Sequence, residues 1–314
     1  MSASTRQLVK PPALRPGDMV GIVAPASNVK QSELEAGCEA LRRAGYKPFY
    51  LNSILERDLY FAGSTTRRAR ELEEMFARDE VRAIICARGG YGANYLLQEL
   101  DLAKVTGNPK IFVGYSDLTT LLTYFVGSGL VTFHGPMVAK DWSQTNGVNL
   151  DSWLAAVTQQ APWNVPVDAH VVSLADGDAE GILYGGCVSI LVASLGTSYE
   201  IKTEDTILFL EDLAAKPYQV DRMLMQLKLA GKFDKVRGLI FGEMIDCVQA
   251  PNQDYSLQEV IKRVVGELRI PVAYGLKSGH VTSNNITLPM GVRARLNVRK
   301  EQVKITILES AVSL

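Results

Sequence analysis

Ser116 stands at the junction of two patterns that favour an exposed, reactive hydroxyl. Residues 111–113 form a short apolar run typical of a buried strand, and residues 117–125 carry apolar side chains at helical spacing. On such a turn a serine hydroxyl projects from the backbone, toward the N–H groups of the new helix. The pattern predicts a nucleophile elbow, although G-Y-S-D-L differs from the G-x-S-x-G of α/β-hydrolases. The alternative is that Ser116 only caps the helix.

An activated serine needs a base, and the chain has only three histidines. His280 lies in a loop rich in glycine, serine and asparagine that follows the apolar run at 271–274. Loops after strands are where sheet enzymes place reactive groups, which makes His280 the preferred base. His134, at the end of another apolar run, is its rival, and His170 lies in a polar segment. The alternatives are a solvated His280 and a buried His134 that is hydrogen-bonded within the core.

The acid that orients the base is expected at the end of a buried strand. The apolar run at 206–210 delivers Glu211 and Asp212 to such a position, and one of the two should point inward while the other faces solvent or a helix cap. Both could instead be caps. Glu243, at the end of another apolar run, is a weaker candidate for the acid.

A glycine-rich turn at 89–92 follows the apolar run at 82–87. Glycine permits backbone angles that leave N–H groups free to meet an oxyanion, so the turn is a candidate oxyanion site. It matches neither the G-x-G-x-x-G fingerprint nor a phosphate loop, which makes nucleotide binding the weaker functional interpretation. A plain tight turn is the alternative.

These residues follow elements that alternate between strand and helix. Alternation of this kind predicts an α/β fold with a parallel sheet, whose ligands bind at the carboxyl ends of the strands. Ser32 and Glu35 have the spacing of a capping box, and a further helix is expected at 93–102. Strands are expected at 19–24, 46–51, 82–87, 111–113, 131–133, 171–174, 181–184, 206–210, 236–241, 271–274, 286–288, 293–298 and 303–308. The last three strands follow one another with short turns and are expected to pair antiparallel.

The polar, proline-containing segment 141–170 is expected to link two domains. The preceding part, 1–140, carries the serine. The following part, 171–314, carries the candidate acid and base.

Composition narrows the class of partner. The 314 residues are 47% hydrophobic and carry a net charge of −1, so neither nucleic acid nor an anionic membrane is expected as partner. The four cysteines are scattered without metal-ligand spacing, and we expect free thiols and no metal. Residues 1–18 lack the apolar segment of a secretory signal, and glycines and a proline break the uncharged run near 118–140. A cytoplasmic location is therefore expected.

Several motifs in order resemble the LD-carboxypeptidase family, the serine peptidases that include muramoyl-tetrapeptide carboxypeptidase and the microcin-immunity hydrolases. The resemblance covers nearly the whole chain. Its most specific pieces are R-G-G-Y-G at 88–92, G-Y-S-D at 114–117, F-L-E-D at 209–212, Y-Q-V-D-R-M-L at 218–224, G-H at 279–280 with Asn285, and L-P-M-G at 288–291.

The resemblance implies a Ser116–Glu211–His280 triad and an oxyanion hole formed by the amides of Gly90 and Asp117. It also implies a flavodoxin-like N-terminal domain, a smaller swivelling C-terminal domain, a homodimer and a site where the domains meet. No metal or other cofactor is required. The implied reaction is loss of the terminal D-alanine from a cell-wall tetrapeptide during recycling, through an acyl-enzyme.

Further substrate contacts are expected from the same glycine turn. Gly89 and Tyr91 belong to the motif, and Arg88 is a candidate for the substrate carboxylate, although a structural ion pair explains it equally well.

Three alternatives stay open. A hydrolase of acyl-sulfamoyl adenylates would favour an aromatic shelf for adenine, and residues 175–186 offer only Tyr184. A non-catalytic peptide- or nucleotide-binding protein would use Ser116 as a cap and His280 as a surface residue. A glutamine-amidotransferase-like enzyme would carry cysteine where the elbow has serine.

Overall fold

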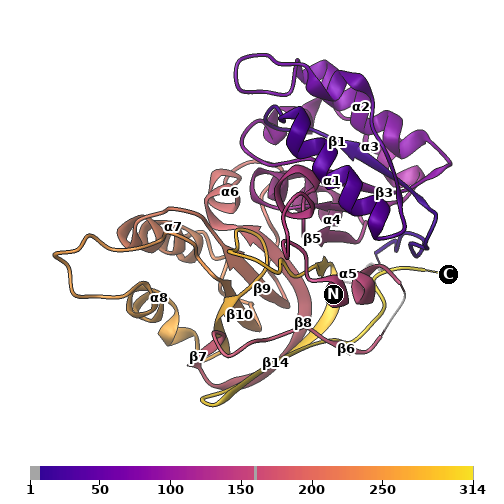
Figure 1. Ribbon diagram of the computed structural model, residues 1–314. Coiled ribbons are helices and arrows are strands. Elements are labelled where there is room, and N and C mark those ends of the chain that lie inside the picture. Colours follow the sequence, from indigo (N-terminus) through magenta and orange to yellow (C-terminus); the bar gives the residue numbers. More distant parts are fainter. Residues whose placement is uncertain (1–7, 159–160, 314) are drawn as a thin grey trace.

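The computed structural model describes residues 8–158 and 161–313. Two β-sheets, one of six strands and one of eight, form its core, and helices flank both (Figure 1). The N-terminal part, indigo to magenta in Figure 1, builds most of the first sheet, and the part coloured orange to yellow builds most of the second. The chain is an α/β protein with two domains, as its sequence predicts. No helix in the described part of the chain is long and apolar enough to cross a membrane.

The first sheet has the strand order of flavodoxin-like folds. Its strands are β1 (Met19–Val23), β2 (Lys47–Phe49), β3 (Val81–Cys86), β4 (Ile111–Gly114), β5 (Thr132–His134) and β12 (Leu288–Met290). The order is β12-β5-β4-β3-β1-β2, and every pair from β2 to β5 is parallel. Parallel strands are covered on both faces, which explains the apolar runs of β1, β3 and β4.

Helices and 3₁₀ turns connect these strands. They are α1 (Gln31–Arg43), η1 (Asn52–Leu55), α2 (Thr65–Ala77), η2 (Ala93–Gln98), α3 (Leu102–Gly107), η3 (Ser116–Leu118) and α4 (Thr119–Gly127). The expected capping box is wrong, because Lys30 stands at the N-cap of α1 and no side chain caps it. Val29 and Leu34, both buried, occupy the positions of a hydrophobic staple, which accounts for the earlier start.

The helix expected at 93–102 is interrupted. Asp101 accepts a hydrogen bond from the N–H of Ala103 and so begins α3 as a separate helix.

The second sheet is parallel at its centre and antiparallel at its edges. Its strands are β6 (Trp163–Asn164), β7 (Val172–Ala175), β8 (Gly177–Cys187), β9 (Thr206–Glu211), β10 (Gly238–Gly242), β11 (Val272–Leu276), β13 (Val292–Arg299) and β14 (Gln302–Ile307). The order is β6-β14-β13-β8-β9-β10-β11-β7, with β8 to β11 parallel. Its helices are α6 (Val188–Ala193), α7 (Pro217–Leu229) and α8 (Leu257–Val265), and the 3₁₀ turn η5 (Gly266–Leu268) follows α8.

Two segments connect the halves. The π-helix η4 (Val138–Trp142) and α5 (Leu150–Val157) follow β5, and the indole N–H of Trp153 donates to the hydroxyl of Tyr46, 3.1 Å away. The late strand β12 returns to pair antiparallel with β5, whereas β13 and β14 form the expected antiparallel hairpin in the second sheet. The domain limits at 140 and 170 and a swivelling motion stay predictions.

Candidate active site

Ser116 begins the 3₁₀ turn that follows β4, and its backbone is left-handed with φ +64°. Such a conformation is rare for a residue with a side chain and is concentrated at functional sites. The capping alternative is wrong, because no side chain caps η3 or α4 and Tyr115, not Ser116, is the N-cap residue of η3. The strand–turn–helix geometry is that of an elbow.

The glycine turn closes against this elbow. A Cβ atom on Gly89 would lie 2.9 Å from Cβ and 3.2 Å from Oγ of Ser116, so only glycine fits at this approach. Gly90 has φ +106°, and a Cβ atom on it would lie still closer, 2.6 Å, to Cβ of Ser27. The N–H of Gly90 makes no hydrogen bond within residues 8–158 and 161–313 and is free to act as a donor.

The carboxylate of Asp117 binds the C-terminal end of the glycine turn. It is buried and accepts the N–H of Ala93 at 2.7 Å. Burial raises the pKa of Asp117 to about 6, against the opposing effects of the backbone N–H groups of Ala93 and Gly92 and of the charge of Arg68. Arg68, also buried, donates to the carbonyls of Pro25 at 2.6 Å and Gly92 at 2.8 Å.

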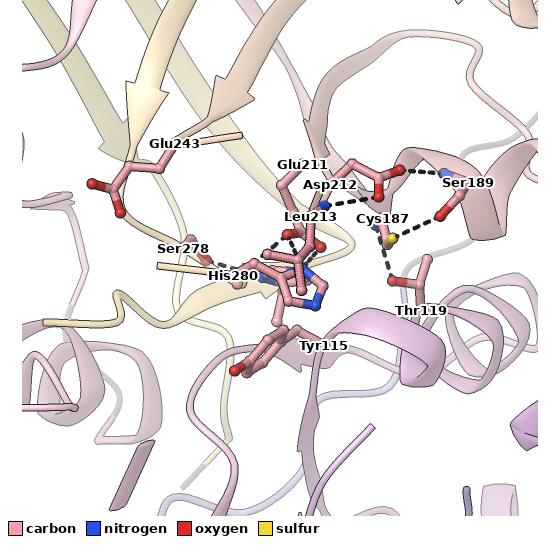
Figure 2. A network of polar contacts seen from close by, with 12 residues as sticks. Tyr115, Thr119, Cys187, Ser189, Glu211, Asp212, Leu213, Glu243, Ser278 and His280 are labelled. Carbon is pink, nitrogen blue, oxygen red and sulfur yellow. Dashed lines mark hydrogen bonds and ion pairs between the residues drawn. The ribbon is translucent and has the colours of Figure 1, made fainter. Parts of the chain in front are cut away.

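Glu211, the last residue of β9, has no exposed surface and points at His280 (Figure 2). Its Oε2 atom accepts from Nδ1 of His280 at 2.7 Å and from the backbone N–H of His280 at 3.1 Å. Burial alone would raise the pKa of Glu211, but its contacts with His280 and His134 lower it to about 2.

His280 is held in one orientation. Burial acts to lower the pKa of its imidazole, and the Glu211 carboxylate outweighs this and raises it. The ring of Tyr115 meets the imidazole edge-on, with ring centroids 5.2 Å apart. Because Nδ1 is committed to Glu211, Nε2 is the nitrogen left for proton transfer.

Asp212 has the second role expected for this carboxylate pair. It accepts from the N–H of Ser189 and from that of Leu213, each at 2.8 Å, and so caps α6 (Figure 2). Glu243 contacts the His280 loop, where it accepts from the backbone and hydroxyl of Thr282.

Two buried residues that hold the His280 loop, Asn285 and Asp141, were not predicted as site residues from the sequence. Asn285 accepts the N–H of Gly279 at 3.0 Å and donates to its carbonyl at 3.1 Å, and a further bond of 3.2 Å joins Asn285 to Asp141. Burial raises the pKa of Asp141 to about 6, against its hydrogen bonds. Asn285 belongs to a motif, which was a signal for it. Asp141 lies in the segment expected to be a linker, and no sequence motif pointed to it.

A cavity of about 710 Å³ joins the two halves of the site, because Ser116, His280 and the glycine turn all line it. The cations Lys30, Arg88 and Lys140 line it too, and the one acidic side chain, Glu33, pairs with Lys30 at 2.9 Å. Tyr91 lines a neighbouring cavity of about 730 Å³ together with Asp117.

The other titratable residues singled out in the sequence lie apart from this cavity. His134 is fully buried at the end of β5, and His170 is exposed. All four cysteines are free, as expected, and buried.

The chain is similar to known proteins along nearly its whole length. Residues 20–135 match the LD-carboxypeptidase N-terminal domain, and residues 180–296 match the LD-carboxypeptidase C-terminal domain. The chain is 35% identical to a probable murein peptide carboxypeptidase of Bacillus subtilis, over 97% of this chain and 95% of the relative. It is 29% identical to the microcin C7 self-immunity protein of Escherichia coli, over 92% of this chain and 93% of that protein.

A solved structure extends the agreement to the fold. The muramoyltetrapeptide carboxypeptidase of Oxalobacter formigenes superposes with a TM-score of 0.83 and 30% identity, over 93% of this chain and 99% of that one. Both halves of the sequence and the arrangement of the two sheets thus agree with one family. The chain belongs to the LD-carboxypeptidase family and is a serine LD-carboxypeptidase-like hydrolase.

Proposed function

We propose that this hydrolase releases the terminal D-alanine from murein tetrapeptides, with Ser116 as nucleophile, His280 as base and Glu211 as orienting acid. The observation that carries the proposal is the 2.7 Å contact between His280 and Glu211 beside a cavity that Ser116 also lines. The names of the relatives in Bacillus subtilis and Oxalobacter formigenes support the choice of substrate.

The reaction follows from the roles of these side chains. Nε2 of His280 takes the hydroxyl proton as Oγ of Ser116 attacks the carbonyl carbon between an L-centre and the D-alanine. The N–H groups of Gly90 and Asp117 stabilise the oxyanion, each by about 3–4 kcal/mol in comparable hydrolases. His280 then protonates the departing amine as the C–N bond breaks, and water hydrolyses the acyl-enzyme.

The charge of the cavity supports an anionic peptide substrate. Arg88 and Lys140 line the wall beside Ser116, and neither forms an ion pair within the described part of the chain. Arg88 donates only to the carbonyl of Asn28, at 3.3 Å, which leaves further donors of its guanidinium for the terminal carboxylate. Gly89 keeps the space beside Ser116 open for the scissile bond.

An acyl-sulfamoyl adenylate is the second candidate substrate. Exposed aromatic side chains gather beside the glycine turn, where the ring centroid of Tyr91 lies 5.9 Å from that of Tyr60 and 6.1 Å from that of Tyr95. A base can stack on such a surface. Tyr184 cannot provide a stacking surface for adenine, because it is buried and its hydroxyl donates to the carbonyl of Thr123.

Mass spectrometry of the products separates the candidates. Purified protein is incubated with murein tetrapeptide, with and without a metal chelator, beside Ser116→Ala and the matched variant Ser143→Ala, whose serine lines the same cavity. We expect loss of one alanine with the wild type and Ser143→Ala and none with Ser116→Ala. Cleavage of an acyl-sulfamoyl adenylate alone would favour the second candidate. Cleavage of neither would favour a binding protein.

A role in cell-wall recycling, a cytoplasmic location and a homodimer complete the proposal. Fractionation of the source cells and light scattering of the purified protein test the last two.

A further inference from the structure

A buried histidine beside the triad has no part in the mechanism. His134 ends β5, has no exposed surface, and its Nδ1 atom lies 2.9 Å from Oγ of Ser278. The same Oγ lies 2.9 Å from the carbonyl oxygen of Ile286. Since a carbonyl only accepts, the single hydroxyl proton of Ser278 goes to Ile286, and Ser278 must accept from His134. Nδ1 of His134 therefore carries a hydrogen.

The other ring nitrogen faces the triad. Nε2 of His134 lies 3.9 Å from Oε1 of Glu211, the oxygen that His280 leaves free. Both atoms are buried, and neither has a hydrogen-bond partner among the residues described. At 3.9 Å the two atoms are in charge contact and not in hydrogen-bond contact. A bare nitrogen lone pair that faces a carboxylate oxygen is repulsive in a dry interior, whereas an N–H there is attractive.

The surroundings leave His134 little freedom. The ring of Phe209 lies 5.0 Å away and that of Tyr115 5.9 Å away, centroid to centroid. Gly279 packs directly against the ring, because a Cβ atom at this position would lie only 2.8 Å from Cε1 of His134. Glu211 is the charged group that faces the ring. Asp141, the next buried carboxylate, accepts from the hydroxyl of Tyr115 at 3.4 Å.

We propose that His134 is a second imidazole partner of the catalytic carboxylate, with a hydrogen on both nitrogens, and that Nε2–H is directed at Oε1 of Glu211. His134 acts through Glu211 and is a positioning residue. It belongs to the sheet that carries Ser116, whereas Glu211 and His280 belong to the second half of the chain. Its contact fixes the acid relative to the nucleophile across the two sheets. The role as a positioning residue rests on the proposed function of the triad.

Nitrogen-15 NMR of histidine-labelled wild-type protein tests the protonation directly and needs no substrate. The three histidines make the spectrum simple, and His170→Gln, an exposed change, assigns one of them. We expect His134 to show hydrogens on both ring nitrogens at neutral pH, and to lose that on Nε2 in Glu211→Gln. A single hydrogen, on Nδ1, in the wild type would overturn the proposal.

Two variants separate the contacts of the ring. Asparagine at 134 places its amide near the position of Nδ1 and can keep the contact with Ser278, whereas glutamine reaches toward Nε2 and can keep a donor to Glu211. We expect kcat to fall by up to about 10²-fold in His134→Asn, because a shifted Glu211 misplaces His280. KM should change little, and His134→Gln should retain more activity.

The rate at which a fluorophosphonate labels Ser116 follows the triad without any peptide. Slower labelling of His134→Asn than of His134→Gln would support the positioning role even if murein peptides are not cleaved. Equal labelling of both variants and of the wild type would contradict that role. If His134→Asn does not fold, labelling of His134→Gln and the NMR spectrum of the wild type still test the proposed role of His134.

Discussion

The carboxylate of Asp117 lies 2.7 Å from the N–H of Ala93, so the residue after Ser116 holds the end of the glycine turn. Asp117 therefore has two functions in the proposed site. Its backbone N–H is a candidate oxyanion donor, and its side chain fixes the turn that carries the other candidate donor, Gly90. This hydrogen bond joins the elbow directly to the end of the glycine turn.

Replacement of Asp117 tests this connection. We expect Asp117→Ala to lower the free energy of unfolding by about 1–3 kcal/mol, because the N–H of Ala93 loses its buried acceptor. A displaced turn should also lower kcat by up to about 10²-fold. Asp117→Asn keeps an acceptor and should lose less of both. Urea unfolding and steady-state kinetics measure the two effects. Equal kcat for wild type and Asp117→Ala would contradict the connection.

A methyl group at Gly89 should affect activity more than stability. The new Cβ would lie 2.9 Å from Cβ of Ser116 and must displace Ser116, the proposed nucleophile, so we expect kcat to fall by up to about 10²-fold. Gly107→Ala is the matched control, because a Cβ there meets nothing within 4 Å. Thermal unfolding of both variants shows whether folding is intact. Normal turnover by Gly89→Ala would mean that Ser116 tolerates the displacement.

The pH profile of kcat/KM reports on His280. Its imidazole must be neutral to accept a proton. Burial acts to lower the pKa of His280, but the negative charge of Glu211 outweighs burial and raises that pKa. Activity should therefore be lost as the pH falls through a value above the ordinary pKa of histidine, about 6.5. In Glu211→Gln the imidazolium loses its counter-charge, and the acid limb should move to lower pH while the maximum rate falls. An unchanged acid limb would exclude His280 as the titrating base.

Arg88 is expected to bind substrate rather than to take part in the chemistry. Arg88→Gln should raise KM with little change in kcat, because a carboxylate contact contributes equally before and during the reaction. A charge-assisted hydrogen bond is worth about 1.5–3 kcal/mol, which corresponds to a rise in KM of about 10–150-fold. Arg82→Gln, an exposed change on β3, is the control. A pure loss of kcat in Arg88→Gln would place Arg88 in the reaction step.

Local sequence patterns predicted the parts of the site that end strands. The apolar run before Ser116 and the helical spacing after it predicted the elbow. The paired carboxylates at 211–212 divide as expected, one toward His280 and one onto the cap of α6. Such features depend on residues adjacent in the chain, which is why they can be read from it.

The supporting residues depend on contacts across the fold. Arg68 lies in a charged helix, and nothing local indicates that it is buried beneath the glycine turn. Asp141 and Asn285 are 144 positions apart and meet only once both halves have folded. The pairing of β12 with β5, which brings a late strand into the first sheet, is of the same kind.

The chemical identity of the acyl-enzyme shows whether Ser116 is the nucleophile. Murein tetrapeptide is mixed with the protein, the reaction is stopped in acid within milliseconds, and the protein is digested and analysed by mass spectrometry. We expect the tripeptide acyl group as an ester on the peptide that contains Ser116, and no such adduct in Ser116→Ala. Release of D-alanine by Ser116→Ala at the wild-type rate, or an acyl group on another residue, would contradict the assignment of Ser116 as nucleophile.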